Sequence, residues 1–338
     1  MYIPTHCVLQ CADLIVKKNG TNVRMSNRFL YAVTVLVWGT TWIGIEYQLG
    51  TVAPEVSVFY RYTLAAICLF AWCSWAGLNL KFSARAHVRF VLLGLLLFGI
   101  NYIVTYHAQQ YITSALTAIC FSTMLWMNMI NARIFFGVRI SKKIIAGSMI
   151  GIAGIVVLFL PQVQSLSLSD ATVYGAALCI IGAFLASLGN MVSQSAQREG
   201  LPVIQSNAWG MFYGAIVTGA IAFGQGITFN FDWSASYIIS LFYLAIFGSI
   251  IAFGSYLKLL GRIGAHKAGY VVVMFPVVAL IVSFLFEGLE LGWNILVGIA
   301  LVLIGNVIIL RMKEDNDTGP NTIEEPVESS DPCMEVSR

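Results

Sequence analysis

The chain has 338 residues, of which 58% are apolar and only 10% are charged, and its mean hydropathy is +0.81. Soluble domains carry about 25% charged residues, so this composition excludes a soluble enzyme, a disordered chain and a disulfide scaffold. The net charge of +3 is small and follows from topology, as argued below, rather than from nucleic-acid binding. We therefore predict a multi-pass protein of the lipid bilayer.

Ten segments have the length and apolar character of membrane-spanning helices. A span needs about 20 mostly apolar residues, because no backbone group can stay unpaired in lipid. In chain order the segments are 29–48, 55–77, 88–109, 111–131, 143–161, 171–193, 203–224, 235–257, 265–286 and 291–311. Their connections are short, which predicts an all-α membrane bundle of ten transmembrane helices without a separate soluble domain.

The basic residues predict the orientation of these segments. If the N-terminus is cytoplasmic, every Lys and Arg except Arg61 falls on the cytoplasmic side. The charged residues of the connections on the opposite side are then all acidic. Cytoplasmic loops of membrane proteins are enriched in Lys and Arg, so both termini are predicted to be cytoplasmic. Residues 1–28 then form a cytoplasmic segment, and residues 312–338 form a disordered acidic cytoplasmic tail.

The chain also resembles itself. Segment 113–159 aligns without a gap to 264–310, and the tripeptide 97–99 resembles 246–248. The identities in the long alignment include three glycine pairs, Gly137/Gly288, Gly147/Gly298 and Gly154/Gly305. The sequence therefore predicts two homologous halves.

These halves are a five-helix repeat at 29–161 and a second five-helix repeat at 171–311. Because five is odd, the second repeat must enter the membrane with the opposite orientation. Inverted repeats of this kind recur in secondary transporters, whose substrate site lies near the middle of the membrane where the repeats meet.

Several short motifs resemble those of a transporter family. They are Trp38-Gly39 in the first predicted helix, Phe59-Tyr60-Arg61-Tyr62 in the second, and Phe275-Pro276 followed by Phe286-Glu287-Gly288 in the ninth. Over about residues 29–311 the chain is similar to the EamA family of the drug/metabolite transporter superfamily. The resemblance implies a ten-helix carrier for small metabolites, often an exporter of amino acids or related compounds. The first half departs from the pattern, with Leu125 opposite Pro276 and Phe136 opposite Glu287.

Arg61 is the one basic residue inside a predicted span. Its guanidinium, which stays charged, could hold a substrate carboxylate with two hydrogen bonds. The other interpretation is a structural ion pair with Glu46, the only acid within the first helix, because charges in the membrane usually pair with each other. Glu46 could also carry a coupled proton, so proton antiport and gradient-driven exchange both stay open.

Deep aromatic and polar side chains are the other candidates for a substrate site. Trp38 and Trp42 are four residues apart and share a helix face, as do Tyr102 and Tyr106. Helix packing and interhelical hydrogen bonds are the alternative roles for such residues. The full set of predicted substrate-binding residues is Trp38, Trp42, Glu46, Arg61, Asn101, Tyr102, Tyr106, Trp126, Asn190 and Tyr270.

Three further features complete the prediction. Pro276 removes a backbone hydrogen bond within a helix, so it is a candidate hinge. His107 falls at an outer helix end, where a solvated side chain is expected. The stripe Gly147, Gly151 and Gly154 suits close helix contact, either within one chain or between two copies, so a homodimer stays open.

The cysteines predict no metal or cofactor. Four of the seven lie inside apolar runs, where a thiol behaves as a small apolar group. Only His6 stands near Cys7 and Cys11, which leaves too few ligands for zinc. We predict no catalytic residue, no metal site and no cofactor.

The function predicted from the sequence is a transporter and not an enzyme. It is predicted to move a small polar metabolite, an amino acid or a derivative, outward across a bacterial-type inner membrane by alternating access. The alternative is efflux of amphipathic drugs or nucleotide-type metabolites, although a multiply phosphorylated substrate needs several inward-facing cations. A membrane enzyme acting on lipids is the alternative from another class, and it would need acids, His or Cys clustered at a membrane face.

Overall fold

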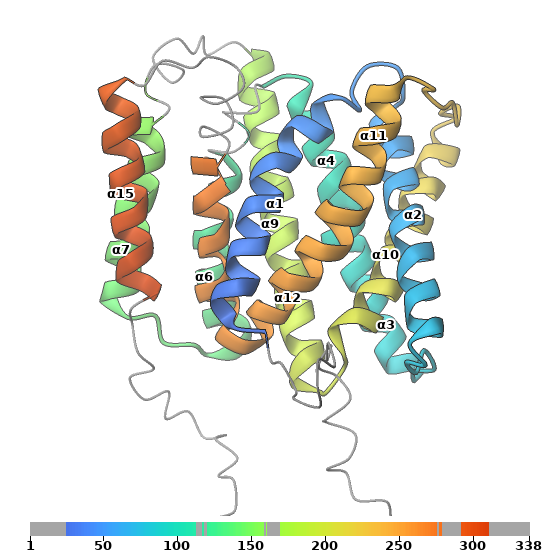
Figure 1. Ribbon diagram of the computed structural model, residues 1–338, viewed down its shortest axis with the longest axis horizontal. Helices are drawn as coiled ribbons and strands as arrows, with labels where there is room; N and C mark the ends of the chain where they lie inside the picture. Colours follow the sequence, from blue (N-terminus) through green and yellow to red (C-terminus); the bar gives the residue numbers. More distant parts are fainter. Residues whose placement is uncertain are drawn as a thin grey trace, which may run out of the picture.

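The computed structural model describes residues 25–112, 117, 120–158, 160, 170–275, 277–278 and 292–310, which form helices and no strand. These helices pack side by side as one bundle (Figure 1). They are α1 (Asn27–Glu46), α2 (Pro54–Trp75), α3 (Ala84–Leu93), η3 (Gly94–Gly99), α4 (Ile100–Gln109), α6 (Met124–Phe136), α7 (Lys142–Leu158), α9 (Asp170–Arg198), α10 (Val203–Gly224), α11 (Ala235–Tyr243), η4 (Leu244–Ile251), α12 (Ala252–Ile263), α13 (Ala265–Ala268) and α15 (Trp293–Leu310).

The predicted fold class, an all-α membrane protein, is confirmed. Each of the ten predicted segments contains helical residues in the described part of the chain. Five described helices are long and apolar enough to cross a membrane, namely Asn27–Glu46, Pro54–Trp75, Ala84–Gln109, Asp170–Arg198 and Ala235–Ile263. The candidate hinge Pro276, the tail 312–338 and most of the N-terminal segment lie outside the described residues.

Local chemistry sets the helix ends. Ser26, Ser83 and Ser234 each accept a hydrogen bond from a backbone N–H of the first turn, at α1, α3 and α11. Such caps satisfy backbone donors that have no partner within the helix. Pro54 opens α2, where its missing N–H costs nothing, and Gly137 ends α6 with a φ of +66°.

The third and eighth predicted helices are each interrupted by a π-helical stretch. In the first half η3 separates α3 from α4, and in the second half η4 separates α11 from α12. The two stretches contain the similar tripeptides 97–99 and 246–248. Since π-helical turns are rare and frequently lie at functional sites, their matched positions support the repeat and draw attention to the space between them.

The contact between α7 and α15 has the reciprocity of a two-fold axis. A Cβ added to Gly147 would lie 3.0 Å from the Gly305 carbonyl oxygen, and one added to Gly154 would lie 2.9 Å from the Gly298 oxygen. The sequence alignment equates Gly147 with Gly298 and Gly154 with Gly305, so exchanging the halves converts one contact into the other. This is how surfaces related by a two-fold axis meet.

The contact between α7 and α15 also shows which helix the predicted glycine stripe packs against. α7 and α15 lie side by side at one edge of the bundle (Figure 1). Gly147 and Gly154 face backbone atoms of α15 in the same chain that are close enough to exclude a side chain, whereas a Cβ on Gly151 would meet the side chains of Val273 and Tyr270. Gly147 and Gly154 therefore serve contact within one chain, and a homodimer stays a prediction.

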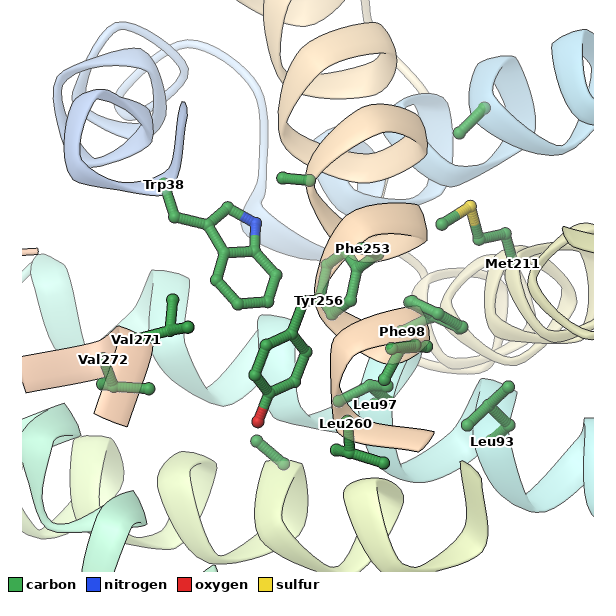
Figure 2. Packing of buried hydrophobic residues seen from close by; sticks show 14 of the residues in the cluster. Trp38, Leu93, Leu97, Phe98, Met211, Phe253, Tyr256, Leu260, Val271 and Val272 are labelled. Atoms are coloured by element: carbon green, nitrogen blue, oxygen red, sulfur yellow. The ribbon is translucent and has the colours of Figure 1, made fainter. Parts of the chain in front are cut away.

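Helices of the two halves interleave at the centre of the bundle. α2 packs on α10, α4 on α9, and α1 on α12. Between them Trp38, Phe253 and Tyr256 point toward one another (Figure 2). The core thus lies where the halves meet, and it surrounds the cavity described next.

Candidate functional site

A cavity that opens to solvent lies between the two halves, and its empty space, counted with the solvent at its mouth, is about 580 Å³. Its aromatic lining consists of Trp38, Trp42, Tyr102, Phe121, Phe253, Tyr256 and Phe275. Its polar lining consists of Thr41, Arg61, Asn101, Thr105 and Asn190, and Ile45, Leu97, Met124 and Ala186 complete it. A few polar groups in an otherwise apolar wall are typical of small-molecule sites.

A row of aromatic rings forms one wall. The Trp38 ring centre lies 4.7 Å from that of Phe253 and 4.9 Å from that of Tyr256 (Figure 2). Phe253 continues the row to Tyr102, with 6.2 Å between ring centres. The Trp38 indole N–H donates to the Gly248 carbonyl oxygen over 3.0 Å, which ties α1 to the π-helical stretch η4. This bond holds the ring in place and satisfies a backbone group of η4.

Arg61 is buried in the lining and keeps a free donor. Its Nε donates to the Ser249 hydroxyl over 2.9 Å, and its guanidinium carbon lies 4.6 Å from the centre of the Tyr102 ring. Its Nη1 has no hydrogen-bond partner among the described residues, and no described carboxylate lies within 4.0 Å. A buried cation without a counter-charge is expensive, which makes this group an anion-binding candidate.

The predicted ion pair between Arg61 and Glu46 is wrong. Glu46 is the last residue of α1 and is exposed, whereas Arg61 points from α2 toward η4. Glu46 does not line the cavity either, although it follows Trp38 and Trp42 at the same spacing. Four residues turn a helix by about 400°, so each four-residue step rotates the side chain by about 40° around the helix axis. After two steps Glu46 no longer lies on the helix face of Trp38.

Of the ten predicted substrate-binding residues, six line the cavity. These are Trp38, Trp42, Arg61, Asn101, Tyr102 and Asn190. Tyr106 is buried beside it and donates to the Gln48 side-chain oxygen over 2.8 Å. Trp126 and Tyr270 belong to a separate apolar cluster with residues of α7 and α15.

Several residues that line the cavity were not predicted from the sequence. Phe253 and Tyr256 stand three residues apart in the eighth predicted helix, a spacing that places them on one face. Phe121 and Met124 have the same spacing in the fourth. The spacing indicates that each pair shares one helix face, but only the packing of the helices shows that these faces line the cavity.

Glu55 and His107 form a pair that the sequence did not predict. The Glu55 carboxylate is buried in the first turn of α2, and His107, which was expected to be solvated, is half-buried near the end of α4. The His107 Nε2 and Glu55 Oε1 atoms are 2.6 Å apart. Among the acids in the described part of the chain, Glu55 is the only buried one.

We expect His107→Ala to lower the free energy of unfolding by about 1–3 kcal/mol, because it leaves a buried carboxylate without its partner. Reversible unfolding in mixed micelles measures the loss. A second change, Glu55→Gln, is expected to restore part of it, since a neutral amide is less costly to leave unpaired. Equal and additive losses in the two single variants and their double would contradict this coupling.

Comparison with known proteins agrees with this architecture. The model of the family described as EamA-like transporter family matches residues 27–160 and 173–311. The inner membrane transporter YedA of Escherichia coli (strain K12) is 27% identical over 81% of this chain and 85% of its own length. The transporter YoaV of Bacillus subtilis (strain 168) is 22% identical over 80% of this chain and 91% of its own.

A solved crystal structure has the same fold. It superposes with a TM-score of 0.70, covers 83% of this chain and 95% of its own, and is 16% identical in sequence. The family match in both halves and the reciprocal glycine contact are two independent indications of the repeat.

Proposed function

The chain belongs to the EamA-like transporter family, and we propose that it exports a small polar metabolite, an amino acid or a derivative, by alternating access. The cavity between the halves is the observation that carries this proposal. Its lining comes from both halves, which is where an inverted-repeat carrier holds its substrate. The free Nη1 of Arg61 offers a charged donor to a carboxylate inside it.

The position of the cavity along the bundle supports alternating access. It reaches Ile45, one residue before α1 ends, whereas on the other side it stops at Asn190 and Tyr256. Beyond that floor, toward the side where α1 begins, Gln194 accepts a hydrogen bond from the Ala265 backbone N–H over 3.1 Å. In this proposal the contact of α9 with α13 through this bond is part of the closed gate, and exchange of the conformations of the two halves would move the gate to the other side.

The lining favours this substrate class over the alternatives. A cationic amphipathic drug would meet the charge of Arg61 with no acid in the described lining to offset it. A nucleotide carries several negative charges and would find one cation. The described lining also holds no His, Cys or acid that could act in lipid hydrolysis.

The proposed location is the inner membrane, with both termini in the cytoplasm. The distribution of Lys and Arg supports the orientation. The relative YedA is named an inner membrane transporter, which supports the compartment.

Transport by the purified protein in proteoliposomes tests the proposal. The panel contains labelled amino acids, their N-acyl and deaminated derivatives, organic cations and nucleotides. We expect saturable uptake of at least one carboxylate-bearing compound, accelerated when the same compound is present on the opposite side. If no compound moves faster than into empty vesicles, the proposed function is wrong.

A further inference from the structure

We propose that the cavity selects an aromatic monocarboxylate that carries a hydrogen-bond donor at the end opposite its carboxylate. In this arrangement Arg61 binds the carboxylate, the row of rings holds the aromatic body, and Asn190 accepts the distal hydrogen bond. The inference rests on the proposed function and names the substrate class of the same cavity.

The charge of the lining sets the charge of the ligand. Arg61 is the only charged residue that lines the cavity in the described part of the chain, and its Nη1 has no partner. The Trp42 indole N–H is a second buried donor of the lining that has no hydrogen-bond partner among the described residues. One negative charge neutralises the guanidinium. A free amino acid brings in addition an ammonium group, for which the described lining holds no carboxylate.

The rings connect the two polar ends. From the Arg61 guanidinium the contacts run to Tyr102 at 4.6 Å, from Tyr102 to Phe253 at 6.2 Å, and from Phe253 to Trp38 at 4.7 Å. Tyr256 follows at 4.9 Å from Trp38 (Figure 2). Such a wall suits a flat aromatic body, because rings pack favourably against rings in edge-on or offset geometry.

Asn190 supplies an acceptor at the far end of this row. Its side chain is fully buried, and its Nδ2 donates to the Tyr256 hydroxyl over 3.0 Å and to the Asn128 side-chain oxygen over 3.2 Å. These bonds orient the amide and leave its Oδ1 without a partner among the described residues. A buried acceptor without a donor is unfavourable, so a ligand that brings an O–H or N–H there gains affinity.

A matched set of probes tests each element. It consists of 3-(4-hydroxyphenyl)propanoate, its uncharged amide, 3-phenylpropanoate without the hydroxyl, tyramine as the cation and tyrosine as the zwitterion. Quenching of tryptophan fluorescence reports binding, since Trp38 and Trp42 line the cavity, and counterflow in proteoliposomes reports transport. We expect the hydroxylated acid to bind about tenfold more tightly than each of the other four.

Asn190→Leu provides a test that does not depend on the yield of folded protein. In this variant the preference for the hydroxylated over the non-hydroxylated acid should disappear, because the acceptor is gone. Asn131→Leu is the control, since Asn131 joins the same two helices through the Ser187 hydroxyl at 2.9 Å but does not line the cavity. It should keep the preference.

Tighter binding of tyramine or tyrosine than of the acid would overturn this inference while leaving the transporter function intact. An unchanged hydroxyl preference in Asn190→Leu would also overturn it. Absence of transport for every compound, including the wider panel described above, would instead refute the proposed function.

Discussion

Arg61→Gln is expected to reduce carboxylate transport about a hundredfold at equal amounts of inserted protein. The change removes the buried charge of the lining and the donor to the Ser249 hydroxyl. Hydrogen bonds to charged groups contribute about 1.5–3 kcal/mol each, so losing a doubly bonded carboxylate costs one to several factors of ten. Initial rates of uptake, normalised to protein in the vesicles, measure the effect.

Arg61→Lys separates charge from geometry. Lysine keeps the charge but has neither the fork of donors nor the planar group over Tyr102, so we expect an intermediate loss of about tenfold. Arg85→Gln is the matched control, because Arg85 is a largely exposed arginine next to Glu199 and lies outside the cavity. If folded Arg61→Gln protein binds the carboxylate probe as tightly as the unmodified chain, Arg61 has only a structural role.

Gly305→Ala is expected to destabilise the contact between α7 and α15 by about 1–3 kcal/mol, the usual cost of overpacking, and Gly305→Leu by more. A Cβ at position 305 would lie 2.5 Å from the Gly147 carbonyl oxygen and 2.8 Å from the Gly151 backbone nitrogen. Backbone atoms cannot turn aside as a side chain can, so the helices must separate. The free energy of unfolding in mixed micelles measures the loss.

Gly254→Ala is the control for this experiment. Gly254 lies within α12, and a Cβ there would meet no atom of the described residues within 4 Å. Alanine also favours the helix more than glycine does, so the variant should be as stable as the original chain or slightly more stable. Equal stability of Gly305→Ala and Gly254→Ala would contradict a glycine-dependent contact.

Much of the fold could be predicted because lipid imposes it on the sequence locally. The predicted span 203–224 coincides with α10 (Val203–Gly224), since a membrane helix must be continuous, apolar and of a certain length. The glycines that aligned between the halves, Gly147 with Gly298 and Gly154 with Gly305, were found again at the α7–α15 contact. A repeated helix contact leaves a repeated pattern of small residues, which a single sequence can reveal.

The site was predicted only in part, because spacing indicates which residues share a helix face but not what that face meets. Trp38 and Tyr102 reached the cavity, whereas Trp126 and Tyr270, equally deep in apolar segments, joined a cluster with α7 and α15. Nothing local distinguishes these cases, since each depends on how neighbouring helices are rotated about their axes.

The charged groups show most clearly which features depend on the local sequence and which depend on the tertiary structure. The sequence alone determined that one arginine would lie inside a span, because the length and composition of that span are local properties. Only the tertiary structure decided that Arg61 would meet Ser249 of the other half, and that Glu55 would be buried against His107. Such partners come from segments far apart in the chain, and the packing of whole helices brings them together.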